Sequence, residues 1–400
     1  MTLVVGYLTG QYPAPSHTFI RREIAAVEAA GCSVHRYAHR QYDGPLVHDA
    51  DREEARCTSI LLDTGLVRLL GNLVVIAIRH PLRFGRVLLH ALGARRSSGA
   101  IVRHLAYLLQ ACTLRRWCER DGVVHLHAHL AMHPTTVAMY THRLGGPRFS
   151  FTVHGPESLE DPHGIDLVEK MQRARHVVAI SRYCRDVLIG LEPSCADRIT
   201  IVRCGVDDAV LTDPAPLPSA FNICCIGRLC PRKQQALLLE ALALILADHA
   251  TTARVTLTLV GDGPDRDAIE AQARSLGLTD CVDIRGWCDD PEVIVAIDAA
   301  RVVTLPSRAE GLPVAIMEAM ARSRTVVTTS VAAIGELVDS KTGWLLSPNC
   351  TAAELAEALH TALLTDDDTM HAMGQRGRAR ILKDHDASLN ARALLDIFRA

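Results

Sequence analysis

The stretch Leu305-Pro-Ser-Arg-Ala-Glu-Gly-Leu-Pro-Val-Ala-Ile-Met-Glu-Ala-Met320 decides how the rest of the chain is interpreted. The apolar, β-branched run that leads into it is typical of a buried strand, whereas residues 314–321 contain no helix breaker. The stretch therefore predicts a strand, a loop and a helix, with Pro313 at the first helical position. Backbone N–H groups at the start of a helix have no partner inside it, and they form a natural anion site.

Two carboxylates flank this predicted anion site. Glu310 lies in the loop, and Glu318 lies about a turn and a half into the helix. Gly311 removes a side chain where a ligand could approach closely. This arrangement suits a ligand that joins phosphate to hydroxyl-rich groups, such as a nucleotide sugar. A glutamate near a helix start can also be a purely structural residue that complements the helix dipole, worth about 0.3–1 kcal/mol.

The size and composition of the chain predict an ordinary globular protein. Its 400 residues allow two or three domains at about 150 residues each. The net charge of −2 and the 4% aromatic content argue against nucleic-acid binding. The 13 cysteines are scattered, and the first residues resemble no signal peptide, so we expect reduced thiols and a cytoplasmic protein. The longest apolar tract, residues 69–78, is shorter than the roughly 18–20 residues of a membrane span.

The first half begins with a βαβ pattern: a strand at residues 3–8, a helix from about 18 to 30 and a second strand from 33. Such a start predicts a parallel sheet with ligands at the carboxyl ends of its strands. The loop that carries Ser16 and Thr18 therefore lies where a phosphate or an acceptor would bind. It lacks the glycines of a dinucleotide fingerprint, which argues against a hydride-transfer enzyme.

Histidines mark two further predicted strands. His125, His127 and His129 occupy alternate positions, which would place them on one face of a strand, as in some metal sites. No carboxylate or further ligand set follows at a recognisable distance, so no metal is expected. His154 ends the next predicted strand, and Gly155 lets a ligand come close; we therefore expect His154 to be functional.

Residues 64–120 are helical and basic in pattern. His80-Pro81 interrupts them, so a helical hairpin is predicted rather than one long helix. Arginine on the polar face of such helices can bind an anionic membrane surface, although a solvated helix face is an equal alternative. The arginines of this segment are Arg68, Arg79, Arg83, Arg86, Arg95, Arg96, Arg103, Arg115 and Arg116.

A proline-rich stretch separates this half from a second βα series. Strands are predicted within 221–226, 255–260, 282–287, 300–306 and 325–329, and helices within 352–364 and 370–400. The predicted organisation is an N-terminal domain at 1–207, a linker at 208–220, a C-terminal domain at 221–380 and a C-terminal helix at 381–400 that packs back on the first domain.

Several motifs resemble those of the retaining glycosyltransferases of family four. Those of the second half are Gly227-Arg-Leu-Cys-Pro-Arg-Lys233, Leu259-Val-Gly-Asp-Gly-Pro264, Glu310-Gly-Leu-Pro-Val-Ala-Ile-Met-Glu318, and Gly335-Glu-Leu-Val with Gly343-Trp-Leu. The exopolysaccharide (colanic-acid-type) branch is resembled by Tyr12-Pro through Thr18-Phe-Ile, His127-Ala-His-Leu and Ser150-Phe-Thr-Val-His-Gly155. The resemblance implies an α/β fold of GT-B architecture, with two Rossmann-like parallel-sheet domains facing each other across a cleft.

The resemblance also implies roles for single residues. Arg228 and Lys233 would clamp the donor diphosphate, Glu310 would face the transferred sugar, Glu318 would accept hydrogen bonds from the ribose, and His154 would touch the sugar, through its 6-hydroxyl. The remaining implied donor or acceptor contacts are Gly311, Leu312 and Val314 through their backbone amides, Gly261, Gly263, Arg285 and Trp287, and Ser16 with Thr18. Two positions depart from the family pattern: Gln234 replaces a common glycine, and His17 replaces a glutamate frequent in the branch.

The implied reaction is a hexosyl transfer from a uridine or guanosine diphosphate sugar to an acceptor hydroxyl, with retention of configuration. The acceptor would be a glycan, a lipid-linked glycan or a small molecule, and the enzyme would be cytoplasmic or peripheral on the inner face of the cell membrane. No metal or cofactor and no nucleic acid is expected. The alternatives are a sugar-nucleotide epimerase of the same fold, a catalytically silent sugar-nucleotide-binding subunit, and a metal hydrolase built on the three histidines.

Overall fold

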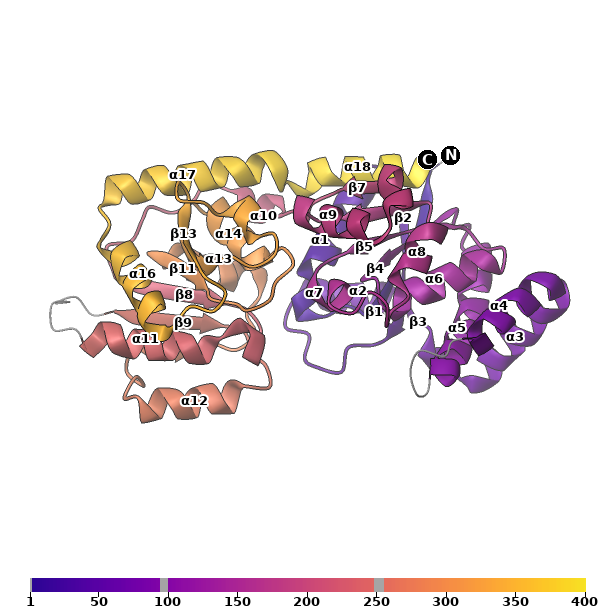
Figure 1. Ribbon diagram of the computed structural model, residues 1–400, viewed down its shortest axis with the longest axis horizontal. Coiled ribbons are helices and arrows are strands. Elements are labelled where there is room, and N and C mark those ends of the chain that lie inside the picture. The colour runs from indigo at the N-terminus through magenta and orange to yellow at the C-terminus, as the bar shows by residue number, and fades with distance from the viewer. Residues whose placement is uncertain (1, 94–99, 248–254) are drawn as a thin grey trace. The chain divides into compact units, whose positions relative to one another are not determined.

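The computed structural model describes residues 2–93, 100–247 and 255–400, and these divide into two compact units. Unit 1 comprises Met1–Arg203 and Ser388–Ala400, and unit 2 comprises Cys204–Ala387. The chain therefore returns to unit 1 for its last residues. Each unit contains one parallel sheet (Figure 1), which confirms the predicted α/β class with two Rossmann-like domains.

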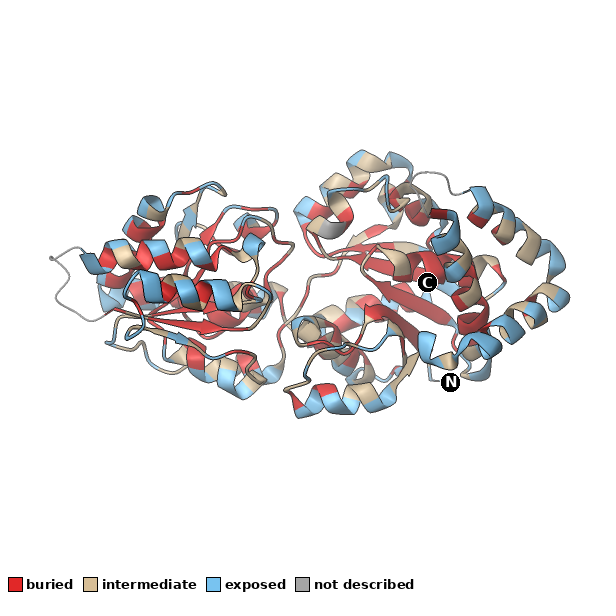
Figure 2. Ribbon diagram, turned by 90° about the horizontal axis from the view of Figure 1, so that it is seen from below, coloured by how far each residue is buried: buried red, intermediate tan, exposed pale blue. Residues whose placement is uncertain are grey.

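Unit 1 is built on a seven-stranded parallel sheet with the order β3-β2-β1-β4-β5-β6-β7. The central strands β1, β4 and β5 are almost entirely buried, as Figure 2 shows, because helices cover both faces of the sheet. The chain fills one side of β1 first and then continues on the other side from β4. The carboxyl ends of β1 and β4 are therefore a topological switch point, where ligands bind in open α/β sheets. The strands are β1 Val4–Gln11, β2 Ser33–Arg40, β3 Thr58–Ile60, β4 His125–His129, β5 Arg148–Val153, β6 His176–Ala179 and β7 Ile199–Ile201.

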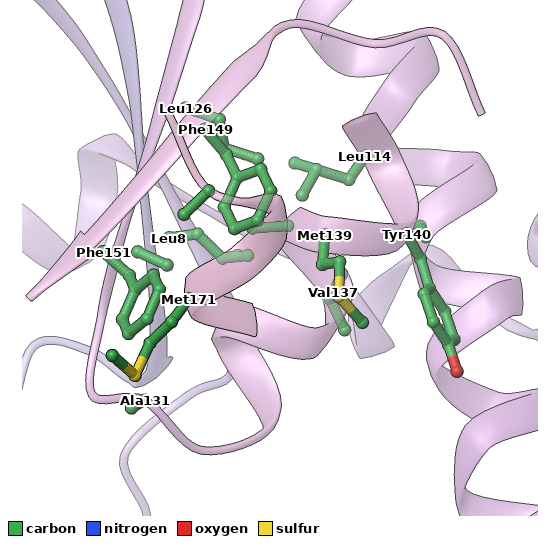
Figure 3. Close-up of a cluster of buried hydrophobic side chains, with 14 of the residues drawn as sticks. Leu8, Leu114, Leu126, Ala131, Val137, Met139, Tyr140, Phe149, Phe151 and Met171 are labelled. Carbon is green, nitrogen blue, oxygen red and sulfur yellow. The ribbon is translucent and has the colours of Figure 1, made fainter. Parts of the chain in front are cut away.

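Two apolar clusters cover the faces of this sheet. One joins α5 and α6 to the strands, and Figure 3 shows Leu114 and Met139 from these helices near Phe149 and Phe151 of β5. The other includes α18, whose Phe398 is buried with residues of β1 and α1. The helices of this unit are α1 Thr18–Ala29, α2 Asp49–Cys57, α3 Leu66–Arg79, α4 Pro81–Gly93, α5 Ala100–Arg120, α6 His133–Arg143, α7 Pro156–Leu159, α8 Leu167–Arg173, α9 Arg182–Leu191 and α18 Ala387–Arg399.

Unit 2 is built on a six-stranded parallel sheet with the order β10-β9-β8-β11-β12-β13, so its switch point lies between β8 and β11. Its strands are β8 Asn222–Ile226, β9 Thr256–Val260, β10 Val282–Ile284, β11 Val302–Leu305, β12 Thr325–Thr329 and β13 Gly343–Leu346. Its helices are α10 Asp208–Leu211, α11 Gln235–Ala247, α12 Arg266–Ser275, α13 Asp290–Asp298, α14 Val314–Ala321, α15 Ile334–Leu337, α16 Ala352–Leu364 and α17 Asp367–Asp384.

The helix of the opening motif, α14, begins one residue later than predicted. Pro313 has extended backbone angles and is the N-cap, and its carbonyl accepts the first helical hydrogen bonds from Ile316 and Met317. The prediction of Pro313 at the first helical position is therefore wrong by one residue. Pro313 still marks the helix start, because its fixed φ of −73° is compatible with either position.

Buried arginines fix the proline-rich stretch to unit 2. Arg322 donates to the carbonyl and hydroxyl of Thr212, and Arg324 donates to the carbonyls of Ala215 and Pro216. The residues that composition predicts as a linker are thus hydrogen-bonded to one of the two units. No helix in the described ranges combines the length and apolar character that crossing a bilayer demands.

Candidate functional site

The loops that follow β8 and β11 meet at the switch point of unit 2. Lys233 follows β8 and Glu310 follows β11, and the Lys233 ammonium donates a 2.5 Å hydrogen bond to the Glu310 carboxylate. The side chains are 18% and 9% exposed. They are 77 residues apart in sequence and meet because β8 and β11 are neighbouring strands whose carboxyl ends lie at the same edge. The sheet order thus brings together two of the predicted site residues.

Gln234 ties the same two loops together. Its φ of 56° lies in the left-handed region, which costs a non-glycine residue about 1–2 kcal/mol and explains why glycine suits this position. With its amide nitrogen facing β11, Gln234 donates to the Pro306 carbonyl at 2.7 Å and accepts from Arg308 at 2.7 and 3.2 Å. The Arg308 N–H donates to the Arg232 carbonyl at 2.8 Å. These contacts offset the backbone strain and hold the ends of β8 and β11 in register.

The start of α14 presents unpaired backbone donors beside this ion pair. Within the described residues, no acceptor takes a hydrogen bond from the N–H groups of Gly311, Leu312, Val314 or Ala315. Pro313 has no N–H to contribute. Orphan donors at the positive end of a helix attract a phosphate or another anion. Chemically, the start of α14 offers four amide donors, and the loop after β8 adds the Lys233 ammonium, to one negatively charged group.

Glycines let the loops after β8 and β9 touch. A Cβ atom at Gly261 would lie 2.2 Å from the carbonyl oxygen of Gly227, and one at Gly263 would lie 2.2 Å from that of Leu229. The loop that carries Arg228 is hydrogen-bonded to this neighbour through Leu229 N–H, which donates to the Asp262 carbonyl. The two predicted glycines therefore shape the loop that bears Arg228, whose side chain is exposed.

The loop after β10 lies further along the sheet edge. The Gly261 N–H donates to the Gly286 carbonyl at 2.8 Å, which joins this loop to the β9 loop. Arg285 is exposed and donates to Asp283 at 2.9 Å, which raises the pKa of the guanidinium. Trp287 is half-buried. Strand β9 separates β10 from β8. Arg285 and Trp287 therefore lie two strands away from the loop that carries Lys233.

Glu318 is buried one turn into α14, with its side chain 7% exposed as part of the unit 2 interior. Its position on the helix that carries the free amides agrees with the spacing of the motif. It belongs to a helix whose other buried residues, Ile316 and Met317, are apolar. A carboxylate on such a face needs polar partners, because burying a charged group without them is costly.

In unit 1, His154 follows β5 at the same sheet edge as the loop after β1. Its Nε2 lies 2.8 Å from the Nδ1 of His129, and its ring lies 4.7 Å from that of Phe19. Thr18 is the first residue of α1, and Ser16 is exposed in the turn before it. The predicted residues of the first half therefore gather around the switch point of their own sheet.

Sequence reasoning missed the carboxylate that accompanies the histidines. Glu23 of α1 accepts a 2.9 Å hydrogen bond from Tyr7 and lies 3.2 Å from the Nε2 of His129. Glu23, His127 and His129 place one potential ligand atom each within 4.8 Å of one another. The inference that no carboxylate accompanies the histidines is therefore wrong. The available signal was the helical spacing of Glu23 and Phe19, which puts both on one face of α1.

Burial favours the neutral forms of these groups. It lowers the pKa of His129 to about 3, with His17 adding a smaller effect, and it also lowers the pKa of His127 and of His154. It raises the pKa of Glu23, although His127 and His154 oppose this shift. Both ring nitrogens of His127 are engaged, by Ser150 at 2.8 Å and Thr152 at 2.9 Å. The arrangement is a hydrogen-bonded network of neutral imidazoles around one carboxyl group.

Two family models match the chain, one in each half. Residues 18–210 match the model described as Glycosyltransferase Family 4, and residues 220–366 match the model described as Glycosyl transferases group 1. The chain belongs to glycosyltransferase family four. These matches confirm the predicted family, which is a family of transferases.

Two relatives of this glycosyltransferase carry names from polysaccharide synthesis. It is 30% identical over 216 residues to WcaL of Escherichia coli strain K12, a glycosyltransferase named for colanic acid biosynthesis, and the match covers 51% of this chain and 52% of WcaL. The chain thus spans about half the length of that relative. It is 26% identical over 315 residues to the glycogen synthase of Mycobacterium tuberculosis strain CDC 1551 / Oshkosh, covering 75% of this chain and 73% of that protein.

A solved structure shows the same fold over the whole chain. The complex of Anabaena Alr3699/HepE with UDP-glucose superposes with a TM-score of 0.72 at 17% sequence identity, covering 98% of both chains. At this level of identity the likeness shows the fold of the glycosyltransferase.

Proposed function

We propose that this glycosyltransferase transfers a hexosyl group from a nucleoside diphosphate sugar to an acceptor hydroxyl with retention of the anomeric configuration. The observation that carries the proposal is the Lys233–Glu310 ion pair beside the row of unpaired amides at the start of α14. A diphosphate needs cations and amide donors, and a sugar needs a carboxylate. The loops after β8 and β11 together supply all of them. The UDP-glucose complex of HepE supports a uridine donor, with guanosine as the alternative.

In this proposal the cations of unit 2 hold and activate the leaving diphosphate. Lys233 and Arg228 neutralise its charge, and each charge-assisted hydrogen bond contributes about 1.5–3 kcal/mol. The amides of Gly311, Leu312 and Val314 donate to phosphate and sugar oxygens. The same donors stabilise charge as it develops on the departing phosphate, which lowers the barrier.

The reaction needs no protein nucleophile and no metal in this proposal. The bond from the anomeric carbon to the phosphate oxygen breaks, the bond to the acceptor oxygen forms on the same face, and the acceptor proton passes to the departing phosphate. Glu310 faces the sugar at the anomeric carbon, Glu318 accepts from the ribose hydroxyls, and His154 contacts the sugar. The remaining proposed contacts are Gly261, Gly263, Arg285 and Trp287 for the nucleotide, and Ser16 and Thr18 for the acceptor.

Donor turnover by the purified protein tests the proposal. We expect one member of a panel of UDP and GDP sugars to release its nucleoside diphosphate, slowly with water and faster with an acceptor, and to do so in the presence of a chelator. Proton NMR of the product should show the anomeric configuration of the donor. An epimerase would instead convert the donor alone to its epimer without releasing nucleotide, and a silent subunit would bind donor without turnover; either result would refute the proposal.

The acceptor is proposed to be a glycan of exopolysaccharide synthesis that is carried on a lipid, as the match to WcaL suggests. The structural support is a hairpin face, defined as Val67, Leu70, Val74 and Ile78 of α3 with Leu82 and Leu89 of α4. All six side chains are exposed; Val67 is 86%, Ile78 75% and Leu82 78% accessible. On α3 they recur at helical spacing and so form one stripe, while Leu69 and Ile76 pack inward.

The charges around the hairpin face favour an anionic membrane surface. Arg68, Arg79, Arg83 and Arg86 on the same two helices are exposed. Beside α3, a groove of about 800 Å³ is lined by Arg68, Arg116, Arg120 and Trp117. Arg95 and Arg96 lie outside the described residues. A contiguous exposed apolar stripe bordered by arginine is typical of helices that lie in the headgroup layer.

Vesicle binding tests this surface. We expect the protein to sediment with phosphatidylcholine vesicles that contain phosphatidylglycerol, less with phosphatidylcholine alone, and less at high salt. The double variant Ile78→Glu/Leu82→Glu should weaken binding at least about tenfold, because each apolar side chain lost from the bilayer boundary costs about 1.5–3 kcal/mol.

The matched control is Val295→Glu/Leu364→Glu, which changes two exposed apolar residues of unit 2. It should bind vesicles like the wild type. Equal sedimentation of both double variants, or no preference for anionic vesicles, would contradict membrane docking through the hairpin face. The transfer proposal would stand in that case.

A further inference from the structure

Three side chains from separate elements of unit 1 form a line of hydrogen-bonding groups. Glu23 of α1 lies 3.2 Å from the Nε2 of His129, at the end of β4, and the Nδ1 of His129 lies 2.8 Å from the Nε2 of His154, after β5. The His129 ring is fully buried, and its Nε2 faces Glu23 without a well-directed hydrogen bond. The line therefore joins two partly exposed groups, Glu23 with 17% of its side chain exposed and His154, through a fully buried imidazole.

We propose that Glu23, acting through His129, sets which ring nitrogen of His154 carries the proton, and so positions His154 for the sugar. Glu23 and His129 are positioning residues in this proposal. It rests on the proposed function, in which His154 contacts the donor sugar.

The 2.8 Å contact between two imidazole nitrogens requires one proton between them. Two lone pairs or two N–H groups would repel each other, and burial keeps both rings neutral. When Glu23 is ionised, the His129 Nε2–H faces it, so His129 Nδ1 is an acceptor. His154 must then donate from Nε2, which leaves its Nδ1 without a proton.

Protonation of Glu23 reverses the direction of the hydrogen bonds along Glu23, His129 and His154. The carboxylic acid donates to His129 Nε2, His129 donates from Nδ1, and His154 accepts at Nε2 and carries its own proton on Nδ1. The two states differ by one proton: a proton gained at His154 Nδ1 moves the His154 Nε2 proton to His129 Nδ1 and the His129 Nε2 proton to Glu23. His154 can thus change from acceptor to donor without becoming a cation.

The surroundings of Glu23 suit this role. Tyr7 of β1 donates to it at 2.9 Å and lies 5.4 Å from the His129 ring, which holds both groups in place. Among the residues that the structure describes, the titratable groups shown to face the line are Tyr7, His127 and His129 from the strands, His154 after β5, and His17 before α1. Within the described ranges, no lysine or arginine forms an ion pair with Glu23. The charge of Glu23 is therefore coupled to imidazoles, as the proposed movement of protons between Glu23, His129 and His154 requires.

Nitrogen NMR on the full-length protein with labelled histidine reads the tautomers directly and needs no substrate. Near neutral pH, we expect the wild type to show His154 protonated at Nε2 and unprotonated at Nδ1. Glu23→Leu removes the partner of His129 and should give a mixed or reversed tautomer at both rings. Glu28→Leu, on the same helix but paired with Arg36, is the matched control and should keep the wild-type pattern.

Donor cleavage supplies the second readout. Glu23→Leu should lower kcat by up to about tenfold, the effect of misdirecting one hydrogen bond between His154 and the sugar, with little change in the donor KM. The wild-type rate should fall towards acidic pH as Glu23 is protonated. This acidic decrease in rate should be absent in Glu23→Leu. Glu23→Asp keeps a carboxylate and should recover part of the rate.

The proposal is overturned if Glu23→Leu leaves the His154 tautomer unchanged, or if it changes the tautomer while kcat and the pH profile stay as in the wild type. Stoichiometric metal in the protein as purified would also overturn it, because an ion at Glu23, His127 and His129 would occupy the nitrogens that the relay uses. Failure of donor turnover in the wild type would instead refute the proposed function, and it would leave the tautomer result interpretable.

Discussion

Replacing Lys233 by methionine is expected to lower donor turnover by about 10²–10³-fold, the usual cost of removing one preorganised donor that stabilises charge in the transition state. Methionine keeps most of the side-chain length and removes the ammonium. In the free protein, that ammonium is held at 2.5 Å by Glu310. It therefore needs little rearrangement to meet the diphosphate beside the amides of α14. The measurement is the rate of nucleoside diphosphate release at saturating donor.

The control for this variant is Lys341→Met, which removes an exposed lysine of the same unit. Its turnover should equal that of the wild type. The melting temperature of Lys233→Met should also be measured, since the variant leaves Glu310 without its cation. A folded Lys233→Met protein that turns over donor at the wild-type rate would remove the main support for sugar transfer at this loop.

Replacing Arg324 by alanine is expected to lower the free energy of unfolding of unit 2 by about 3–5 kcal/mol, the cost of breaking a buried charge network by removing one partner. The guanidinium is 1% exposed. It donates to the carbonyls of Ala215, Pro216, Asp298 and Arg322 at 2.8 to 3.1 Å. Alanine would leave these acceptors unsatisfied and would release the proline-rich stretch from the unit.

Denaturant unfolding followed by tryptophan fluorescence measures this effect. Trp287 and Trp344 lie in unit 2, so a Trp117→Phe background removes the signal of unit 1 and reports one transition. Arg274→Ala, which truncates an exposed arginine of the same unit, should change the midpoint little. A loss in Arg324→Ala no larger than in Arg274→Ala would show that these hydrogen bonds contribute nothing measurable.

The sequence predicted the sheets because their strands are buried on both faces. A segment such as β11, Val302–Leu305, is buried along its whole length and is therefore rich in β-branched and apolar residues, and the loops and helices between such segments imply parallel pairing. Local rules also predicted the break at His80-Pro81, where α3 ends at Arg79 and α4 begins at Pro81. Pro313 was placed one residue too far inside its helix, because both positions accept the same φ.

The contacts that give each site its chemistry were less predictable. Lys233 and Glu310 were each identified by motif, but their ion pair depends on β8 and β11 being neighbours. Gln234 looked like a simple departure from glycine. Only the folded loops supply the partners, Pro306 and Arg308, that stabilise its left-handed backbone.

By itself, the sequence determined the α/β class, the parallel sheets, the family and the loops that carry the candidate residues, since these follow from local patterns of apolar residues, glycine and proline. Only the tertiary structure decided that Glu23 joins the histidines and that buried arginines bind the proline-rich stretch. These are contacts between residues distant in the chain, and local spacing carries no information on which distant groups burial brings together.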